Sequence, residues 1–100
     1  MGQVRIAVPT DRIADFCRRN RIRRLCVFGS ALRDDFGPDS DVDVLVEFEP
    51  DAAVGYIRLA ALEHELGEVL GRKVDMNTAN GLHGRFRDKV LAEAEVLYAA

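Results

Sequence analysis

The stretch VFGSALRDDFGPDSDVDVLVEF, residues 27–48, places a Gly-Ser turn after one apolar segment and two aspartates at the start of the next. Successive side chains of a strand point to opposite faces of its sheet. Alternation therefore puts Val42, Val44, Val46 and Phe48 on one face and Asp41 and Asp43 on the other. The apolar face predicts a buried strand. Two neighbouring carboxylates repel each other unless solvent or a cation neutralises them, and a divalent cation with oxygen ligands meets that need.

A third aspartate repeats this pattern in KVDMNT, residues 73–78, where alternation turns Asp75 away from Val74 and Met76. If this strand lies beside residues 41–48, we expect three carboxylates to converge. The Gly29-Ser30 turn leaves a strand and opens a helical turn, which directs backbone N–H groups at an anion. Amides for a phosphate beside carboxylates for Mg²⁺ predict a site for a metal-bound nucleotide.

Other site motifs fit the residues less well. The segment from residue 39 to residue 50 resembles the start of a calcium-binding loop, but Val44 replaces its glycine and Pro50 its final glutamate. No glycine-rich stretch supplies the lysine of a P-loop. His64 and His83 lie too far apart in the sequence to predict a zinc site.

The remaining segments alternate between helical and strand patterns. Helical spacing predicts a helix capped by Thr10 and ending near Asn20, and a second helix from residue 54 to about residue 70, stopped by Gly71. Residues 24–28 predict a strand. A closing helix is expected from about residue 85 to residue 98, with one side formed by Phe86, Val90, Leu91, Leu97 and Tyr98.

The chain has 100 residues, the size of one domain, and we expect residues 1–100 to form a single domain. No apolar run approaches the length of a membrane span and no signal peptide is evident, which favours a cytoplasmic protein with reduced, buried thiols at Cys17 and Cys26. Residues 1–33 contain eight arginines against two aspartates, whereas the other residues sum to a charge of −9. The basic segment 18–24 is either a solvated helix end with an exposed strand edge or a surface for an acidic partner.

A resemblance to a known family follows from these motifs. Residues 28–48 resemble the signature of the DNA polymerase beta-like nucleotidyltransferase superfamily, a Gly-Ser followed by Asp-x-Asp, and GRKVDMNT (71–78) resembles its third-carboxylate strand. FRDKVLAEAEVLY (86–98) is similar to the closing stretch of the minimal nucleotidyltransferase (MNT) family. The resemblance implies a polymerase beta-like fold of the α/β (α+β) class, with a small mixed sheet flanked by helices.

The resemblance also implies roles for individual residues. By this match the nucleotide-binding residues are Gly29, Ser30 and Arg33, and the catalytic and metal-binding residues are Asp41, Asp43 and Asp75. Leu32 and Asp34 depart from the sequence that the family often has around Arg33. The implied cofactors are Mg²⁺, as two ions, and ATP as the nucleotide donor.

The function that the resemblance implies is that of a type VII-like antitoxin. It would transfer AMP to a tyrosine of a partner HEPN ribonuclease toxin, in a hetero-oligomer with that toxin, with neither a membrane nor a nucleic acid as direct partner. Two alternatives remain open. One is an antitoxin that blocks its toxin by binding alone, through a basic surface such as residues 18–24. The other is a nucleotidyltransferase that acts on a small molecule.

Overall fold

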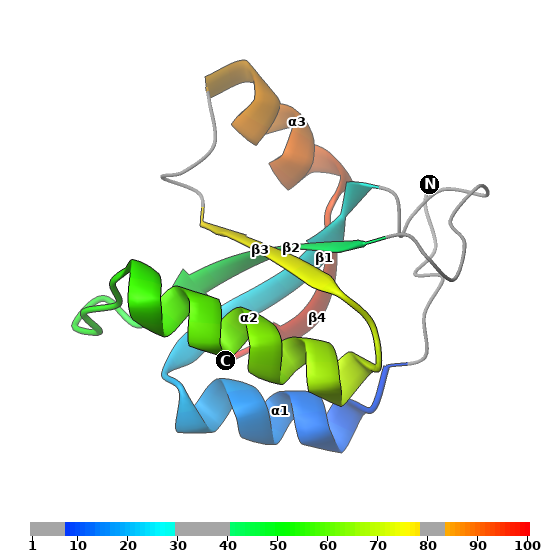
Figure 1. Ribbon diagram of the computed structural model, residues 1–100. Coiled ribbons are helices and arrows are strands. Elements are labelled where there is room, and N and C mark those ends of the chain that lie inside the picture. Colours follow the sequence, from blue (N-terminus) through cyan, green and yellow to red (C-terminus); the bar gives the residue numbers. More distant parts are fainter. Residues whose placement is uncertain (1–7, 30–40, 79–83) are drawn as a thin grey trace.

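A computed structural model describes residues 8–29, 41–78 and 84–100. The elements are helix α1 (Thr10–Arg19), strands β1 (Ile22–Phe28) and β2 (Val42–Phe48), helix α2 (Tyr56–Leu70), strand β3 (Val74–Thr78), helix α3 (Gly84–Glu93) and strand β4 (Glu95–Ala99). Their arrangement, a sheet with helices on both sides, is shown in Figure 1. The expected mixed α+β fold, with a small sheet flanked by helices, is confirmed.

The described strands form one four-stranded sheet in the order β3-β2-β1-β4. Strand β1 is antiparallel to both β2 and β4, whereas β2 and β3 are parallel and are joined through α2. A parallel pair needs such a crossover, because the chain must return to the same end of the sheet before it can start the second strand. The amino ends of β2 and β3 therefore lie next to each other.

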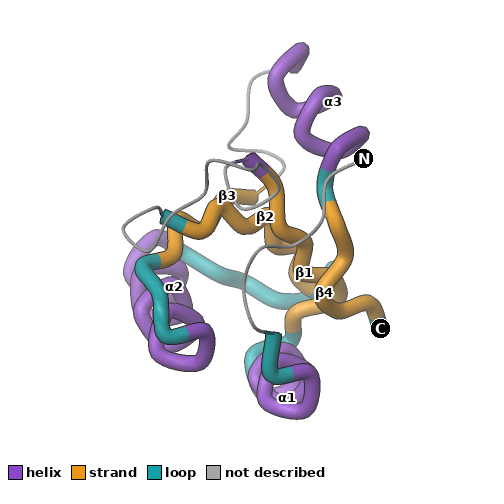
Figure 2. Tube along the Cα trace, turned by 90° about the vertical axis from the view of Figure 1, so that its right-hand side faces the viewer, coloured by secondary structure: helices purple, strands orange, loops and turns teal. Residues whose placement is uncertain are grey.

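The main core lies between one face of the sheet and the helices α1 and α2 (Figure 2). Alternate residues of β2, including Val42 and Val44, are completely buried on this face, as expected. Phe48 is only partly buried and packs against the edge of the same core. Leu62 and Leu66 of α2 are 1% and 0% exposed, and Gly71 ends this helix in the left-handed conformation (φ 67°), as predicted.

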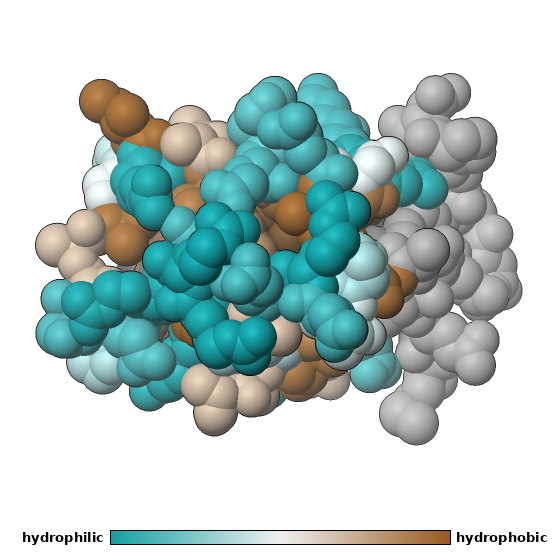
Figure 3. Space-filling view, turned by 90° about the horizontal axis from the view of Figure 1, so that it is seen from below, coloured by the Kyte–Doolittle hydropathy of each residue, from teal (hydrophilic) through white to brown (hydrophobic). Residues whose placement is uncertain are grey.

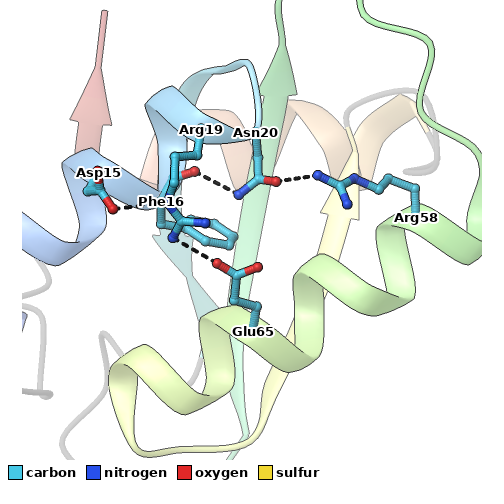
Figure 4. A network of polar contacts seen from close by, with 6 residues as sticks. All are labelled: Asp15, Phe16, Arg19, Asn20, Arg58 and Glu65. Atoms are coloured by element: carbon cyan, nitrogen blue, oxygen red, sulfur yellow. Dashed lines mark hydrogen bonds and ion pairs between the residues drawn. The ribbon is translucent and has the colours of Figure 1, made fainter.

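A buried amide links α1 to α2. The Asn20 side chain follows the last turn of α1 and is 8% exposed. Its Nδ2 donates to the carbonyl oxygen of Phe16 at 2.9 Å, and its Oδ1 accepts a hydrogen bond from Arg58 of α2 (Figure 4). Because both polar ends of the amide are satisfied, burying it costs little, and it fixes how the two helices pack.

The start of α1 differs from the expectation that Thr10 caps it. Thr10 is the first helical residue, Pro9 occupies the capping position, and no side chain caps the helix. The carbonyl oxygen of Pro9 accepts the first helical hydrogen bond, from the N–H of Ile13 at 2.9 Å. Proline suits this end of a helix because the N–H that it lacks would have no helical partner there.

The predicted closing helix is wrong beyond residue 93. Helix α3 ends at Glu93, and residues 95–99 form β4, so Leu97 and Tyr98 do not share a helix face with Val90. Tyr98 lies opposite Leu25, and Val96 opposite Cys26, in the ladder with β1. This pairing satisfies backbone groups along β1, and the β-branched and aromatic side chains suit a strand.

Candidate functional site

Two aspartates meet across the parallel strands at one end of the sheet. Asp43 of β2 and Asp75 of β3 are register partners, and Asp41 directly precedes β2. Their strand neighbours Val42 and Val74 are 0% and 5% exposed in the core. The aspartates therefore face the other side of the sheet, away from α1 and α2. The predicted adjacency of the two aspartate strands is confirmed.

Gly29 lies directly against one of these carboxylates. It follows β1, whose last residue, Phe28, is the register partner of Asp43. Its φ is 71°, in the left-handed region that favours glycine. A methyl group built at Gly29 would stand 2.5 Å from Oδ2 of Asp43 and 3.4 Å from its Cγ. Both the backbone conformation and the carboxylate exclude a larger side chain here.

A small apolar cluster lies on the same face of the sheet as Asp43. It consists of the buried residues Cys26, Phe28, Leu45 and Val90, with Ala94 packed against it. Val90 comes from α3, which lies on the side of the sheet opposite α1 and α2 (Figure 1). Asp43 thus stands beside an apolar surface and is half-buried, whereas Asp75 on the edge strand is exposed.

Hydrogen bonds on both sides hold β3 in place. On its inner side, the N–H of Val42 donates to the carbonyl oxygen of Lys73 at 2.9 Å. The Asn77 amide donates to the carbonyl oxygens of Val44 and Asp75 at 3.4 and 3.2 Å. On the outer side, Oε2 of Glu63 in α2 accepts the N–H of Met76 at 2.7 Å. Sequence reasoning missed Glu63, because nothing in the spacing of α2 distinguishes this acid from its neighbours.

The arrangement of acidic side chains bears on whether the site could hold a metal ion. Within residues 8–29, 41–78 and 84–100, no group of three or more His, Cys, Asp or Glu side chains lies close enough together to hold a metal ion. Asp43 and Asp75 are brought together by the strand register, and the convergence of all three carboxylates stays a prediction. The oxygen donors of Asp43 and Asp75 do suit a hard divalent cation, which would need further ligands from a bound molecule.

Two of the predicted site residues, Ser30 and Arg33, lie outside the described residues, as does the helical turn expected after Gly29. The same holds for His83. The other histidine, His64, pairs with Glu68 at 3.4 Å on the exposed side of α2. Its position gives no support to a zinc site.

The basic segment 18–24 is largely neutralised by acids of the same chain. Arg19 donates to both Asp15 of α1 and Glu65 of α2 at 2.9 Å (Figure 4). Hydrophilic side chains cover most of the face that α1 and α2 present to solvent (Figure 3). The segment leads into β1, which is an inner strand, so the expectation of an exposed strand edge is wrong.

Further arginines of this segment are also paired. Arg21 forms an ion pair with Asp51 and, by hydrogen bonding to it, lowers the pKa of that carboxyl. Arg23 reaches Glu47 at 3.4 Å. These pairs favour a solvated surface over a docking surface for an acidic partner, because the charges are already compensated.

The two cysteines are free and buried, as predicted. Burial raises the pKa of Cys17 to about 12, and it also raises the pKa of Cys26. Such thiols are unreactive at neutral pH. Among the described residues, none of the helices has the length and apolar character needed to cross a membrane.

Comparison with known proteins points to one family. A family model described as nucleotidyltransferase domain matches residues 11–97. The protein adenylyltransferase MntA of Thermococcus cleftensis is 36% identical over 87 residues, which cover 87% of this chain and 86% of that protein.

Two solved structures share the fold. One, a toxin–antitoxin with AMP-PNP, has a TM-score of 0.74 and 19% identity, covering 93% of this chain and 75% of that one. The other contains an MNT antitoxin in complex with a tri-AMPylated HEPN toxin from Shewanella oneidensis. It has a TM-score of 0.66 and 19% identity, covering 91% of this chain and 70% of that one.

Proposed function

Since the chain belongs to the nucleotidyltransferase domain family, we propose that it transfers AMP from ATP to a tyrosine of a partner HEPN toxin and thereby neutralises that toxin. Its nucleotidyltransferase activity follows from the family. What we propose is the acceptor, a tyrosine, and the partner, a HEPN toxin. The similar protein of Thermococcus cleftensis is named a protein adenylyltransferase. A complex with the same fold joins an MNT antitoxin to an AMPylated HEPN toxin.

The observation that carries this proposal is the register of Asp43 with Asp75 beside the backbone of Gly29. Two oxygen ligands from adjacent strands suit Mg²⁺, and the backbone of Gly29 lies beside one of them. Asp43 is half-buried and pressed against Gly29, so its carboxylate has little freedom to turn away. Asp75 is exposed, which leaves its carboxylate accessible to an incoming hydroxyl group.

Each residue then has a role in the transfer. Gly29 and Ser30 would hold the triphosphate, and Asp41 and Asp43 would hold Mg²⁺. The metal would supply charge neutralisation at the phosphates. Asp75 completes the metal site or takes the proton of the acceptor hydroxyl, whose oxygen forms a bond to the α-phosphorus as the bond to pyrophosphate breaks.

The test is to incubate the protein with its partner HEPN toxin and Mg-ATP and to measure the mass of the toxin. We expect the toxin to gain the mass of one or more AMP groups on tyrosine. Asp43→Asn should lower the rate by roughly 100-fold or more, because a metal ligand loses its charge. The melting temperature should stay unchanged or rise slightly, since repulsion with Asp75 is relieved.

Asp51→Asn is the matched control, because Asp51 is an exposed acid beyond the opposite end of β2. It should transfer AMP at the wild-type rate. A toxin that is inhibited without any gain in mass would identify a binding-only antitoxin. If AMP passes to an added small hydroxyl compound and not to the toxin, the small-molecule alternative is correct.

A further inference from the structure

A glutamate of α2 holds the edge strand that contains Asp75. Oε2 of Glu63 accepts the backbone N–H of Met76, the residue after Asp75, at 2.7 Å. Met76 itself is anchored, because its side chain is 5% exposed in the core. The bond is short and has a charged acceptor, and such bonds are among the stronger ones in proteins.

The position of β3 explains why this bond matters. Strand β3 is at an edge of the sheet, with β2 on its inner side. Alternate N–H groups of a parallel edge strand point away from the ladder, and that of Met76 points to Glu63. Without this acceptor, the backbone N–H of Met76 would donate to water. Strand β3 could then shift along β2 or away from it.

One turn further along α2, Gly67 brings the helix backbone close to the start of β3. A methyl group at Gly67 would stand 2.9 Å from the carbonyl oxygen of Arg72, and the N–H of Arg72 donates to the carbonyl oxygen of Gly67 at 3.0 Å. Helix α2 therefore accepts backbone hydrogen bonds from the chain on both sides of Asp75, at residues 72 and 76. Of these two hydrogen bonds, the one to Glu63 has a side-chain acceptor and the one to Gly67 has a backbone acceptor.

We propose that Glu63 is a positioning residue for the nucleotidyl transfer: by accepting the N–H of Met76, it keeps Asp75 in register with Asp43. This rests on the proposed function, because it takes Asp75 to be part of the reacting site. Glu63 itself belongs to α2, and its hydrogen bond goes to the backbone of Met76 and to neither aspartate.

The experiment compares Glu63→Gln, which keeps an oxygen acceptor of the same length, with Glu63→Leu, which removes it. Glu68→Leu is the matched control, because Glu68 is an exposed acid of the same helix. In Glu63→Leu, we expect the Met76 amide to exchange with deuterium roughly tenfold faster or more. The kcat of transfer should fall about tenfold, with the KM for ATP unchanged. Glu63→Gln should restore most of the kcat, and Glu68→Leu should behave like the wild type.

To distinguish a purely structural role of Glu63 from positioning of Asp75, the effect of Glu63→Leu on transfer is measured again in a protein that also carries Asp75→Asn. Once Asp75 no longer acts, Glu63→Leu should cause no further loss of the residual transfer. An equal tenfold loss in that background would overturn the proposal. A wild-type kcat for Glu63→Leu would overturn it as well, even if the Met76 amide exchanges faster.

Failure of the proposed function would look different. In that case the wild type does not modify the toxin, and the NMR signals of Asp75 become the readout. We expect the amide and Cα shifts of Asp75 to change in Glu63→Leu but not in Glu63→Gln or Glu68→Leu. Unchanged Asp75 shifts in all three variants would refute the positioning role on their own.

Discussion

At the scale of single residues, Gly29 meets two requirements at once. Its φ of 71° is costly for any residue with a side chain, and its backbone leaves only enough space for the Asp43 carboxylate. Gly71 shares the first requirement, with a φ of 67°, but a methyl group there would meet nothing within 4 Å. Comparing substitutions at the two glycines therefore separates the energetic cost of a left-handed backbone from the effect of a side chain on Asp43.

We expect Gly29→Ala and Gly71→Ala each to lose about 1–2 kcal/mol of stability, the cost of a left-handed alanine. Only Gly29→Ala should also lose transfer activity, by roughly tenfold or more, because the new methyl group displaces the Asp43 carboxylate. Urea denaturation and the toxin-modification assay measure the two effects. Equal activity in both variants would show that the position of Asp43 is not important.

The aspartates themselves predict how ATP binds. Mg²⁺ takes six oxygen ligands and is usually held by one or two carboxylates together with substrate phosphates, so we expect a cation at Asp43 and Asp75 to use phosphate oxygens of ATP as further ligands. ATP should therefore bind at least about tenfold more tightly with Mg²⁺ than with EDTA. Isothermal calorimetry checks this, and the same affinity under both conditions would contradict it.

At the scale of elements, α2 has a buried face and an exposed beginning. Leu66 is 0% exposed in the main core, whereas Ile57 in the first turn is 90% exposed. The residue before it, Tyr56, is 91% exposed. These apolar side chains contribute nothing to the core of the isolated chain.

Matched alanine substitutions in α2 should therefore differ sharply in stability. Leu66→Ala is expected to cost about 2–5 kcal/mol, because it leaves a cavity between the helix and the sheet. Ile57→Ala should stay within about 0.5 kcal/mol of the wild type. Denaturant unfolding of both variants tests this, and a large loss for Ile57→Ala would mean that its side chain is covered in solution.

At the scale of the whole molecule, the two faces of the sheet have different tasks. One face is covered by α1 and α2, and the core between them includes the fully buried Cys17 of α1. The other face presents Asp43 and Asp75 beside a smaller cluster that α3 covers. Stability and the candidate site are thus placed on opposite sides of the same strands.

The buried thiol makes the stability of the molecule depend on pH. Burial raises the pKa of Cys17 from 9.0 to about 12, so folding favours the protonated thiol. The corresponding stability is fully present below pH 9 and is lost as the pH rises toward 12. Between pH 9 and 10.5, the wild type should lose about 1 kcal/mol more per pH unit than Cys17→Ala. If the free energy of unfolding changes with pH in the same way for the two proteins, the raised pKa of Cys17 is contradicted.

The sequence by itself determined the features that depend on residues near one another. Alternation placed Val42 and Val44 in the core and Asp43 on the opposite face, and Gly71 marked the end of α2. The Gly-Ser and Asp-x-Asp motifs led to the family that the comparison then showed. Side-chain alternation and helix termination are set within a few residues, so they can be predicted from a short stretch of chain.

Only the tertiary structure decided the features that depend on distant residues. Residues 95–99 form a strand because β1 offers them a ladder, although their spacing also suits a helix. The pairing of Arg19 with Glu65 and the bond from Met76 to Glu63 join segments that no local pattern connects. The free energy of such contacts comes from backbone and side-chain groups that meet only after the chain has folded, and for that reason local periodicity could not predict them.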